Sequence, residues 1–347
     1  MNNALVSIII PTYNNSELLK QMIVSILAQT YENWELIIVD DVSQDDTQIC
    51  VAEFQNRDAR IKYFLRDRDP KGGQTCRNIG FAISKGEYVV FFDADDVVSS
   101  TCLEQRVLFM TQNKNIDFGI FPAVAFSDKE GKRVFDYKSV WGKNRNTDVL
   151  SSFLRADYQF AVWTNIYKRE SVLNISWDER VLIFQDFDYN VSSIFSKLKY
   201  KFSDSDVFDY FYRVGYSDNS VCSRFITNEK YESVIYLFSK TIKNIARIYG
   251  HHSKYKKDFF GFILHYFYKL VADGDIELVN KYVIFCSGYY SWSKISEMKI
   301  YSFLSRNIIK KNKTMDKYLI KICFPGQMIN TVLRKINRNA TKQESQN

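Results

Sequence analysis

The sequence contains few of the residues from which a metal–sulfur site or a disulfide framework is built. Its 347 residues include six cysteines and three histidines. No two cysteines form a CxxC pair, and no histidine stands near a cysteine at the spacing of a zinc site. We therefore expect reduced, mostly buried thiols, and neither a zinc site nor disulfide bonds.

Long hydrophobic runs are also missing. The most apolar stretch, residues 259–272, is interrupted by His265 and Lys269. No stretch reaches the roughly 20 uncharged residues that a helix needs to cross a bilayer. Residues 1–4 carry neither the basic region nor the small-residue cleavage site of a signal peptide. We expect a protein that has no membrane-spanning segment and stays in the cytoplasm.

Aromatic and positively charged residues, by contrast, are plentiful. Aromatic residues make up 16% of the chain, in a globular composition with 46% hydrophobic and 25% charged residues. The formal net charge is +7, and it is unevenly distributed, because from Ile226 onward 21 Lys and Arg stand against 9 Asp and Glu. The C-terminal third is therefore basic, whereas the preceding part is slightly acidic.

The N-terminal part alternates between strand and helix signals. A β-branched run ends at Pro11, and apolar residues then recur at roughly helical spacing at Leu18, Met22 and Ile26. The strand-like runs are residues 6–10, 35–39, 61–64 and 88–92, and the helix-like stretches are residues 17–29, 47–55, 75–84 and 103–110. Strands that are apolar on both faces and alternate with helices indicate a parallel sheet covered by helices on both faces. Ligands bind such sheets beyond the carboxyl ends of the strands.

The pattern loosens after residue 110. We expect short strands around residues 118–126 and a hairpin near residues 129–132. From about Ile226, long helical stretches rich in Tyr, Phe, Ile and Lys dominate. The sequence thus predicts an α/β domain over residues 1–225 and a mainly helical, basic region over residues 226–347.

The strongest chemical signal is the acidic cluster Asp93-Ala94-Asp95-Asp96, which follows the hydrophobic run 88–92. Like charges gathered at the end of a buried strand cost stability unless a cation is present. Oxygen ligands favour Mg²⁺ or Mn²⁺, which commonly take one or two protein carboxylates and complete their coordination with phosphate oxygens and water. A diphosphate-bound metal fits this pattern. The alternative is that Asp93 caps the following helix and the other carboxylates are solvated.

Two further polar loops follow strand-like runs. Asp40 and Asp41 open an acidic loop in which a carboxylate could accept a hydrogen bond from a uracil imide or a ribose hydroxyl, although a helix N-cap explains part of it as well. Residues 71–80 place two glycines before a helix that carries Arg77, which suits a close approach of the backbone to phosphate. Neither a Walker loop nor a Rossmann glycine fingerprint is present.

Together these segments resemble family-2 glycosyltransferases of the GT-A fold. Residues 6–14 are similar to the opening strand ending in Pro-x-Tyr-Asn, and residues 33–47 to the second strand with its Val-Asp-Asp-Gly-Ser-x-Asp loop, except that Val42 replaces the usual Gly. Residues 71–80 resemble Gly-x-x-x-Ala-Arg-Asn-x-Gly with Cys76 in place of Ala, and residues 86–96 resemble Gly-Glu-Tyr followed by Asp-x-Asp. The resemblance implies a Rossmann-like GT-A sheet and an enzyme of the kind that builds bacterial surface polysaccharides.

The resemblance also implies roles for individual residues. Thr12 and Asp41 would contact the nucleotide base, Arg77 would help to hold the nucleoside, and Asp93 and Asp95 would serve the ribose and the Mg²⁺ or Mn²⁺ ion. The full set expected to bind the donor, a nucleotide sugar and most simply a UDP-sugar, is Pro11, Thr12, Tyr13, Asp41, Arg77, Asp93, Ala94 and Asp95.

An inverting transferase also needs a general base for the acceptor hydroxyl. Residues 182–189 resemble the Glu-Asp segment of the family, with Gln185 in place of Glu, and Asp186 aligns with the catalytic base. Asp188 is the second choice. The alternative is that Asp186 is an N-terminal helix carboxylate favoured by the helix dipole.

Two other residues are candidates for contacts with the acceptor or the diphosphate. By the resemblance, Trp163 would stack against a sugar, although a core tryptophan fits the sequence as well. Arg213 lies in a segment similar to a loop that closes over the donor diphosphate, but the usual His after Tyr-Arg-x is missing.

The basic C-terminal region allows two interpretations. Lys254, Lys256 and Lys257 beside the aromatic residues 259–268 suit an anionic membrane surface at the inner face of the cell membrane, as for relatives that elongate lipid-linked glycans. An ordinary helical domain with an aromatic core is the alternative. The expected acceptor is a glycan or lipid-linked glycan, and no nucleic acid is expected. A nucleotidyltransferase and a non-catalytic binding module remain as other functions.

Overall fold

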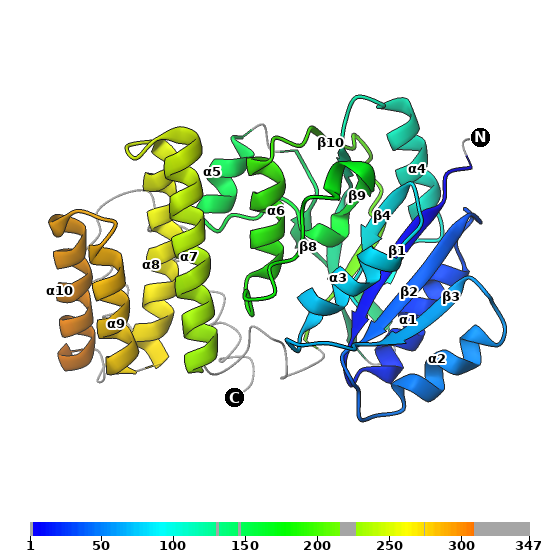
Figure 1. Ribbon diagram of the computed structural model, residues 1–347, viewed down its shortest axis with the longest axis horizontal. Coiled ribbons are helices and arrows are strands. Elements are labelled where there is room, and N and C mark those ends of the chain that lie inside the picture. Colours follow the sequence, from blue (N-terminus) through cyan, green and yellow to red (C-terminus); the bar gives the residue numbers. More distant parts are fainter. Residues whose placement is uncertain (1–2, 130–131, 145–146, 216–226, 274, 309–347) are drawn as a thin grey trace. The chain divides into compact units, whose positions relative to one another are not determined.

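A computed structural model describes residues 3–129, 132–144, 147–215, 227–273 and 275–308 of the chain (Figure 1). The fold divides into two units, Met1–Phe153 with Asp157–Ser223, and Leu154–Ala156 with Arg224–Asn347. The boundary expected near residue 225 falls among residues 216–226, which lie outside the described residues.

A seven-stranded sheet forms the centre of the first unit, in the order β10-β6-β9-β4-β1-β2-β3. Its strands are β1 (Val6–Thr12), β2 (Trp34–Asp40), β3 (Ile61–Leu65), β4 (Tyr88–Phe91), β6 (Phe118–Ile120), β9 (Asn165–Lys168) and β10 (Tyr200–Phe202). The four strands expected from the N-terminal pattern run parallel, whereas β9 lies antiparallel between β4 and β6. The sheet is therefore mixed and not wholly parallel. The sequence did not predict this, because the apolar pattern of a strand as short as β9 does not reveal its direction.

Helices cover both faces of this sheet, as the alternation predicts. The helices of the unit are α1 (Ser16–Leu27), α2 (Thr47–Gln55), α3 (Gly73–Ile83), α4 (Cys102–Gln112), α5 (Val149–Leu154) and α6 (Gln185–Phe195), with 3₁₀ turns at Val162–Thr164 and Glu170–Val172. Ile8 and Ile10 join the core that includes α1, while Ile9 faces α3 on the other side. A side chain at Gly80 of α3 would come within 2.5 Å of Ile9 Cγ2, so glycine allows the helix to pack closely on β1.

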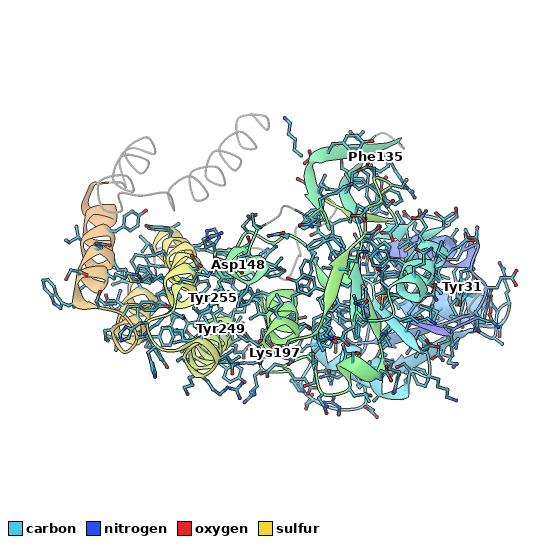
Figure 2. All side chains as sticks on the ribbon, turned by 90° about the horizontal axis from the view of Figure 1, so that it is seen from above. Tyr31, Phe135, Asp148, Lys197, Tyr249 and Tyr255 are labelled. Atoms are coloured by element: carbon cyan, nitrogen blue, oxygen red, sulfur yellow. The ribbon has the colours of Figure 1, made fainter. Side chains whose placement is uncertain are left out.

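A second sheet in the same unit has four strands in the order β5-β11-β7-β8. These are β5 (Val97–Val98), β7 (Ala123–Lys129), β8 (Lys132–Trp141) and β11 (Tyr210–Arg213). The strands β7 and β8 pair antiparallel, as expected for a hairpin, and β11 joins the sheet between β5 and β7. Phe135 lies on the edge strand β8 (Figure 2). It packs against Phe126 of β7, with their ring centroids 6.3 Å apart.

The second unit consists of helices with an aromatic core. They are α7 (Asn228–Tyr249), α8 (Lys254–Asp273), α9 (Ile276–Ser287) and α10 (Trp292–Ile308). The Thr227 and Asp275 side chains accept the backbone N–H groups of Lys230 and Leu278 and so cap α7 and α9. The buried aromatic residues include Phe238, Phe259, Phe262, Tyr266, Phe267 and Tyr282. The aromatic side chains of α8 therefore serve the core of this unit.

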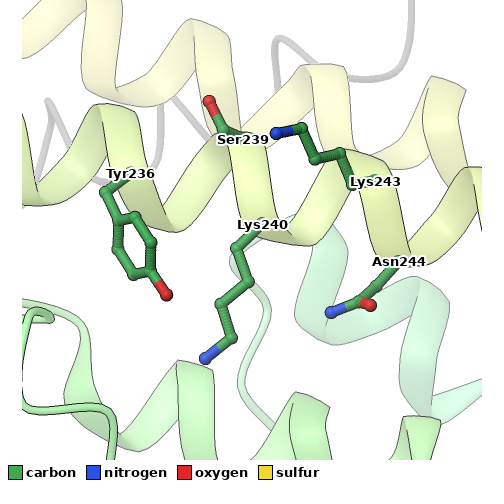
Figure 3. Close-up of a pocket in the computed structure, with 5 residues that line it drawn as sticks. All are labelled: Tyr236, Ser239, Lys240, Lys243 and Asn244. Carbon is green, nitrogen blue, oxygen red and sulfur yellow. The ribbon is translucent and has the colours of Figure 1, made fainter.

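A pocket of about 290 Å³ lies along α7 (Figure 3). Its lining residues are Tyr236, Ser239, Lys240, Lys243 and Asn244. The pocket contains two lysines and no carboxylate, which distinguishes it from the acidic strand ends of the first unit. Within the described part of the chain, no helix is both long enough and apolar enough to span a bilayer.

Candidate functional site

The polar loops singled out in the sequence meet at one edge of the seven-stranded sheet. Thr12 and Asp40 are paired in register at the ends of β1 and β2, and the Asp41 backbone N–H donates to the Thr12 carbonyl oxygen at 2.9 Å. On the other side of β1, Phe92 donates its backbone N–H to Ile9 at 3.1 Å, and Asp93 follows. Parallel pairing of β1 with both neighbours thus brings the acidic loops together.

The loop after β2 is held in one conformation by hydrogen bonds. One Asp40 carboxylate oxygen accepts the Ser43 backbone N–H at 2.8 Å, and the other accepts the Tyr63 hydroxyl at 2.6 Å. Val42 has φ of 65°, so the loop keeps a left-handed residue even though valine stands where the family has glycine.

Asp41 pairs with an arginine that the sequence motifs did not reveal. Arg66 Nε lies 2.5 Å from Asp41 Oδ1, and the two side chains are 12% and 7% exposed. Arg66 follows β3, whose end lies beside the end of β2, and its backbone N–H donates to the Asp40 carbonyl oxygen at 2.8 Å. In the sequence, the position of Arg66 directly after the third strand was the signal that could have identified it.

The loop after β1 offers polar and aromatic groups to a ligand. The Thr12 hydroxyl is buried and has no hydrogen-bond partner within the described residues, which is unusual for a buried polar group. Tyr13 is 44% exposed, and Lys71 Nζ lies 3.5 Å from the centroid of its ring. A side chain at Gly73 would come within 3.8 Å of Pro11 Cβ, so the start of α3 lies against this loop.

Arg77 of α3 links the acidic loop to the start of α6. Its Nη2 lies 2.6 Å from Asp93 Oδ1, and its Nη1 donates to Gln185 Oε1 at 3.2 Å. The guanidinium lies over the Trp177 ring, 4.5 Å from its centroid. Its Nε is buried and has no hydrogen-bond partner in the described structure. The sequence motifs predicted Arg77, but they did not reveal Trp177.

The carboxylates of residues 93–96 differ in their surroundings. The Asp93 side chain is 27% exposed, Asp95 faces solvent, and Ala94 and Asp96 are buried. Incomplete hydration, together with the negative charge of Asp93, raises the pKa of Asp95 to about 6, although its side chain is accessible. Burial raises the pKa of Asp96 well above its usual range.

This donor set fits a cation that is shared with a diphosphate. Among the described residues, no group of three or more His, Cys, Asp or Glu side chains forms a ready-made metal site. Asp95 and Asp93 can supply one or two oxygen ligands, as Mg²⁺ and Mn²⁺ require when phosphate oxygens complete the coordination. Desolvation and then the charge of Asp93 raise the pKa of Asp95, and a bound cation would favour its ionised form.

Asp186 lies in the first turn of α6, after Phe184, whose φ is 64°. The Val162 backbone N–H donates to its carboxylate. Burial and then the charge of Asp93 raise the pKa of Asp186 to about 6, while the Arg77 guanidinium opposes the rise. The charges of both Asp93 and Arg77 therefore act on Asp186. Asp188, the second choice, is 5% exposed and lies in the same turn.

Trp163 belongs to an aromatic cluster. It is 5% exposed and stacks on Tyr210 and Tyr212, with ring centroids 4.6 Å and 5.4 Å away. Trp141 meets it edge-on at 5.3 Å. Little of its surface is left for a sugar.

Arg213 is 6% exposed and is extensively hydrogen-bonded within the protein. Its Nε donates to the Asp95 carbonyl oxygen at 2.7 Å, its Nη2 donates to Gln21 Oε1 at 2.8 Å, and its Nη1 pairs with Asp128.

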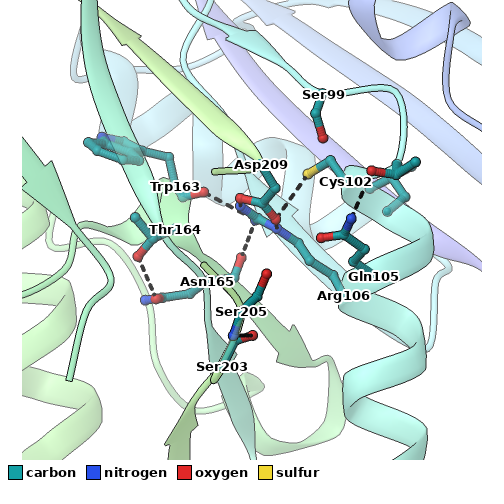
Figure 4. Close-up of polar contacts among 12 residues, drawn as sticks. Ser99, Cys102, Gln105, Arg106, Trp163, Thr164, Asn165, Ser203, Ser205 and Asp209 are labelled. Atoms are coloured by element: carbon teal, nitrogen blue, oxygen red, sulfur yellow. Dashed lines mark hydrogen bonds and ion pairs between the residues drawn. The ribbon is translucent and has the colours of Figure 1, made fainter. Parts of the chain in front are cut away.

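A buried ion pair supports the strand that carries Arg213. Arg106 of α4 and Asp209 form two hydrogen bonds, of 2.7 Å and 2.9 Å, and their side chains are 0% and 1% exposed (Figure 4). Arg106 Nη1 also donates to the carbonyl oxygens of Trp163 and Asn165. Because a buried charge is tolerated only when it is paired and hydrogen-bonded, this arrangement fixes the position of the residue before Tyr210.

Comparison with known proteins agrees with this geometry. The family model described as Glycosyl transferase family 2 matches residues 7–175. Residues 7–175 thus carry the sequence pattern of glycosyl transferase family 2. The family 2 segment contains all the predicted donor-binding residues from Pro11 to Asp95, whereas Asp186 and Arg213 lie beyond it.

Curated relatives match mainly this segment. The chain is 32% identical over 173 residues to an uncharacterized glycosyltransferase of Haemophilus influenzae, and the match covers 50% of this chain and 65% of the relative. It is 37% identical over 145 residues to the Escherichia coli UDP-Glc:alpha-D-GlcNAc-diphosphoundecaprenol beta-1,3-glucosyltransferase WfgD, and the match covers 41% of this chain and 56% of WfgD. The chain therefore spans less than two thirds of the length of either relative.

A solved structure shows the same fold over a longer stretch. The crystal structure of S. aureus TarS 1–349 in complex with UDP-GlcNAc has a TM-score of 0.63 and 16% sequence identity, covering 87% of each chain. This likeness confirms the GT-A fold class expected from the sequence, with its C-terminal helical region.

Proposed function

We propose that this protein is an inverting glycosyltransferase that transfers a sugar from a nucleotide-diphosphate sugar, most simply a UDP-sugar, to a hydroxyl group of a glycan or lipid-linked glycan. One observation carries the proposal. The charge of Asp93 acts on both Asp95 and Asp186, and Arg77 bonds to both Asp93 and Gln185, the neighbour of Asp186. The proximity of these groups supports the proposal that Asp93 and Asp95 serve a cation while Asp186 serves a proton.

On the donor side, Asp41 and the Thr12 hydroxyl are the proposed contacts with the nucleoside, and Asp95 with Asp93 would hold Mg²⁺ or Mn²⁺. The ion, when bound, neutralises charge on the departing diphosphate. The unpartnered Thr12 hydroxyl and Arg77 Nε are polar groups that a nucleotide sugar would satisfy.

On the acceptor side, Asp186 is the proposed general base. The bond from the acceptor oxygen to the anomeric carbon forms as the bond from that carbon to the diphosphate oxygen breaks, and Asp186 takes the proton of the acceptor hydroxyl. With a pKa of about 6, its carboxylate is ionised at neutral pH and remains basic enough to accept this proton. No covalent intermediate with the enzyme is needed.

The name of WfgD, which specifies a diphosphoundecaprenol-linked acceptor, supports a lipid-linked glycan as one acceptor class. With such an acceptor, the proposed place of work is the inner face of the cell membrane. Lys254, Lys256 and Lys257 at the start of α8 are the proposed contact with anionic lipid, made by charge, since the aromatic side chains of α8 are largely buried.

Calorimetry of UDP binding in the presence of Mn²⁺ or EDTA tests the donor side. Metal-dependent binding that disappears in Asp95→Ala is expected. A preference for a nucleoside triphosphate over UDP would instead favour a nucleotidyltransferase. A screen of nucleotide sugars for hydrolysis and transfer then identifies the donor.

Asp186→Asn tests the acceptor side. We expect UDP and Mn²⁺ binding to persist, while transfer falls by about 10²- to 10⁴-fold, the usual contribution of a general base. Asp188→Asn is the matched variant in the same turn of α6. Normal transfer by Asp186→Asn together with loss in Asp188→Asn would move the base to Asp188.

A further inference from the structure

One strand of the second sheet holds the acidic loop of the first. The Tyr210 hydroxyl of β11 accepts the Asp93 backbone N–H at 3.2 Å and donates to Asp96 Oδ2 at 2.7 Å. Arg213 of the same strand donates its backbone N–H to Asp96 Oδ1 at 2.7 Å and its Nε to the Asp95 carbonyl oxygen at 2.7 Å. The backbone on both sides of Ala94 is thus fixed by β11.

These contacts are buried and supported from behind. Asp96 and Tyr210 are 0% exposed, and both carboxylate oxygens of Asp96 accept hydrogen bonds from β11. The strand is anchored at one end by the buried Arg106–Asp209 pair and at the other by the bond from Arg213 to Gln21 of α1. A buried network with these connections holds its members in one arrangement.

We propose that Tyr210, Arg213 and Asp96 form a latch that sets the geometry in which Asp93 and Asp95 meet a divalent cation. The inference rests on the proposed transferase function and gives these three residues a positioning role. Mg²⁺ tolerates little deviation from octahedral geometry, so ligands held in place before binding lose less conformational freedom when the ion arrives. Asp96 positions the acidic loop through its two hydrogen bonds to β11. Arg213 positions it through the hydrogen bond to the Asp95 carbonyl oxygen.

Tyr210→Phe is the direct test, because it removes one hydroxyl and keeps the ring that packs on Phe92 and Trp163. Calorimetry with UDP and increasing Mn²⁺ should show an apparent Mn²⁺ affinity about tenfold weaker, the upper end of the effect of losing one hydrogen bond. Binding of UDP in EDTA should not change. A Mn²⁺ affinity equal to that of the unmodified protein overturns the latch.

A matched control separates positioning from stability. Tyr282 in the helical unit is also fully buried, and its hydroxyl donates to the Ile263 carbonyl oxygen at 3.0 Å. Tyr282→Phe should lower the unfolding temperature as Tyr210→Phe does, while leaving the Mn²⁺ affinity unchanged. An equal loss of Mn²⁺ affinity in both variants would mean that reduced stability alone explains the effect, which also overturns the latch.

Two substitutions of Asp96 distinguish a latch from a metal ligand. The asparagine of Asp96→Asn can still accept the Arg213 N–H and can donate to the Tyr210 oxygen, so it should keep Mn²⁺ affinity close to that of the unmodified protein. Asp96→Ala should lose about tenfold or more, because it removes both bonds. An equal loss in the two variants would show that Asp96 acts through its charge and contradict the proposal.

The same titrations separate this inference from the proposed function. If Mn²⁺ has no effect on UDP binding to the unmodified protein, both the proposed function and the latch are overturned. If Mn²⁺ promotes binding and Tyr210→Phe leaves that effect intact, the latch alone is overturned.

Discussion

At the scale of single residues, Val42 adopts a backbone conformation that β-branched residues rarely take. Its φ is 65°, and its side chain is 42% exposed. Val42→Gly should raise the free energy of unfolding by about 1 kcal/mol. Relief of roughly 1–2 kcal/mol of left-handed strain outweighs the roughly 0.5–1 kcal/mol that glycine loses in chain entropy. Urea denaturation measures the difference.

Val207 provides the control for Val42. It is a loop valine that is 57% exposed, and it is not among the described residues with positive φ. Val207→Gly gains no relief of strain and should leave stability equal or lower. A loss of stability in Val42→Gly would contradict the strained loop.

Asp95 should make metal-dependent donor binding sensitive to pH. Its pKa of about 6 lies above the ordinary aspartate value, so the carboxylate is ionised above pH 6 and protonated below it. Because only the ionised form binds a cation, the apparent Mn²⁺ affinity measured with UDP should be constant above about pH 7 and fall roughly tenfold per pH unit well below 6. An affinity that stays constant down to pH 5 would exclude Asp95 as the ligand.

The raised pKa of Asp95 also lowers the stability of the metal-free protein at neutral pH. A carboxyl group whose pKa is raised by folding lowers the free energy of unfolding once the pH exceeds its pKa in the unfolded chain. The full loss of stability is present above the pKa of about 6 in the folded protein. Asp95→Asn should therefore raise the stability of the metal-free protein at pH 7.5, by less than about 1 kcal/mol because solvent screens an exposed group. Thermal unfolding in EDTA tests this. Added Mn²⁺ and UDP should stabilise only the unmodified protein.

Sequence motifs located most of the candidate site residue by residue. Thr12 ends β1, Asp93 and Asp95 come after β4, and Arg77 lies in the helix between β3 and β4, all in segments with clear periodic patterns. The pairing of Arg66 with Asp41 and the hydrogen bonds of Asp96 and Arg213 were not predictable, because they depend on which strands become neighbours.

At the scale of elements, the packing of α3 on β1 places Arg77 and Gly73. Gly80 is at the closest approach, where a Cβ would lie 2.5 Å from Ile9 Cγ2. Gly80→Ala should therefore lower the free energy of unfolding by about 1–3 kcal/mol, as overpacking of a core usually does. Gly288→Ala is the control, since its Cβ would have only an ordinary contact, 3.5 Å from the Phe285 carbonyl oxygen. Equal effects in denaturation would contradict this account of the packing.

The N-terminal elements were predictable because each carries its own periodic signal. The strands β1 to β4 and the helices between them appear within a few residues of the expected bounds. The antiparallel direction of β9 and the partners of β11 were not predictable, since a strand of four residues is too short to encode its neighbours.

At the scale of the whole molecule, the proposed donor site belongs to one unit. Every residue assigned here to the donor, the cation or the base lies between Pro11 and Arg213, within the first unit. Residues 1–225 expressed alone should fold and bind UDP with Mn²⁺ at an affinity within about an order of magnitude of that of the full chain, because these contacts remain. Calorimetry tests this, with Asp95→Ala in the shortened chain as the control. Failure of a folded 1–225 fragment to bind would show that the helical unit contributes to the donor site.

The attachment of residues 93–96 to Tyr210 and Arg213 also sets an order of events during synthesis. The first four strands are complete once residue 91 has left the ribosome, and they can then pair with one another. The partners of the acidic loop arrive more than a hundred residues later, since Tyr210 and Asp93 are separated by 117 positions. A nascent chain therefore acquires its carboxylates early and their final arrangement only after β11 has been translated.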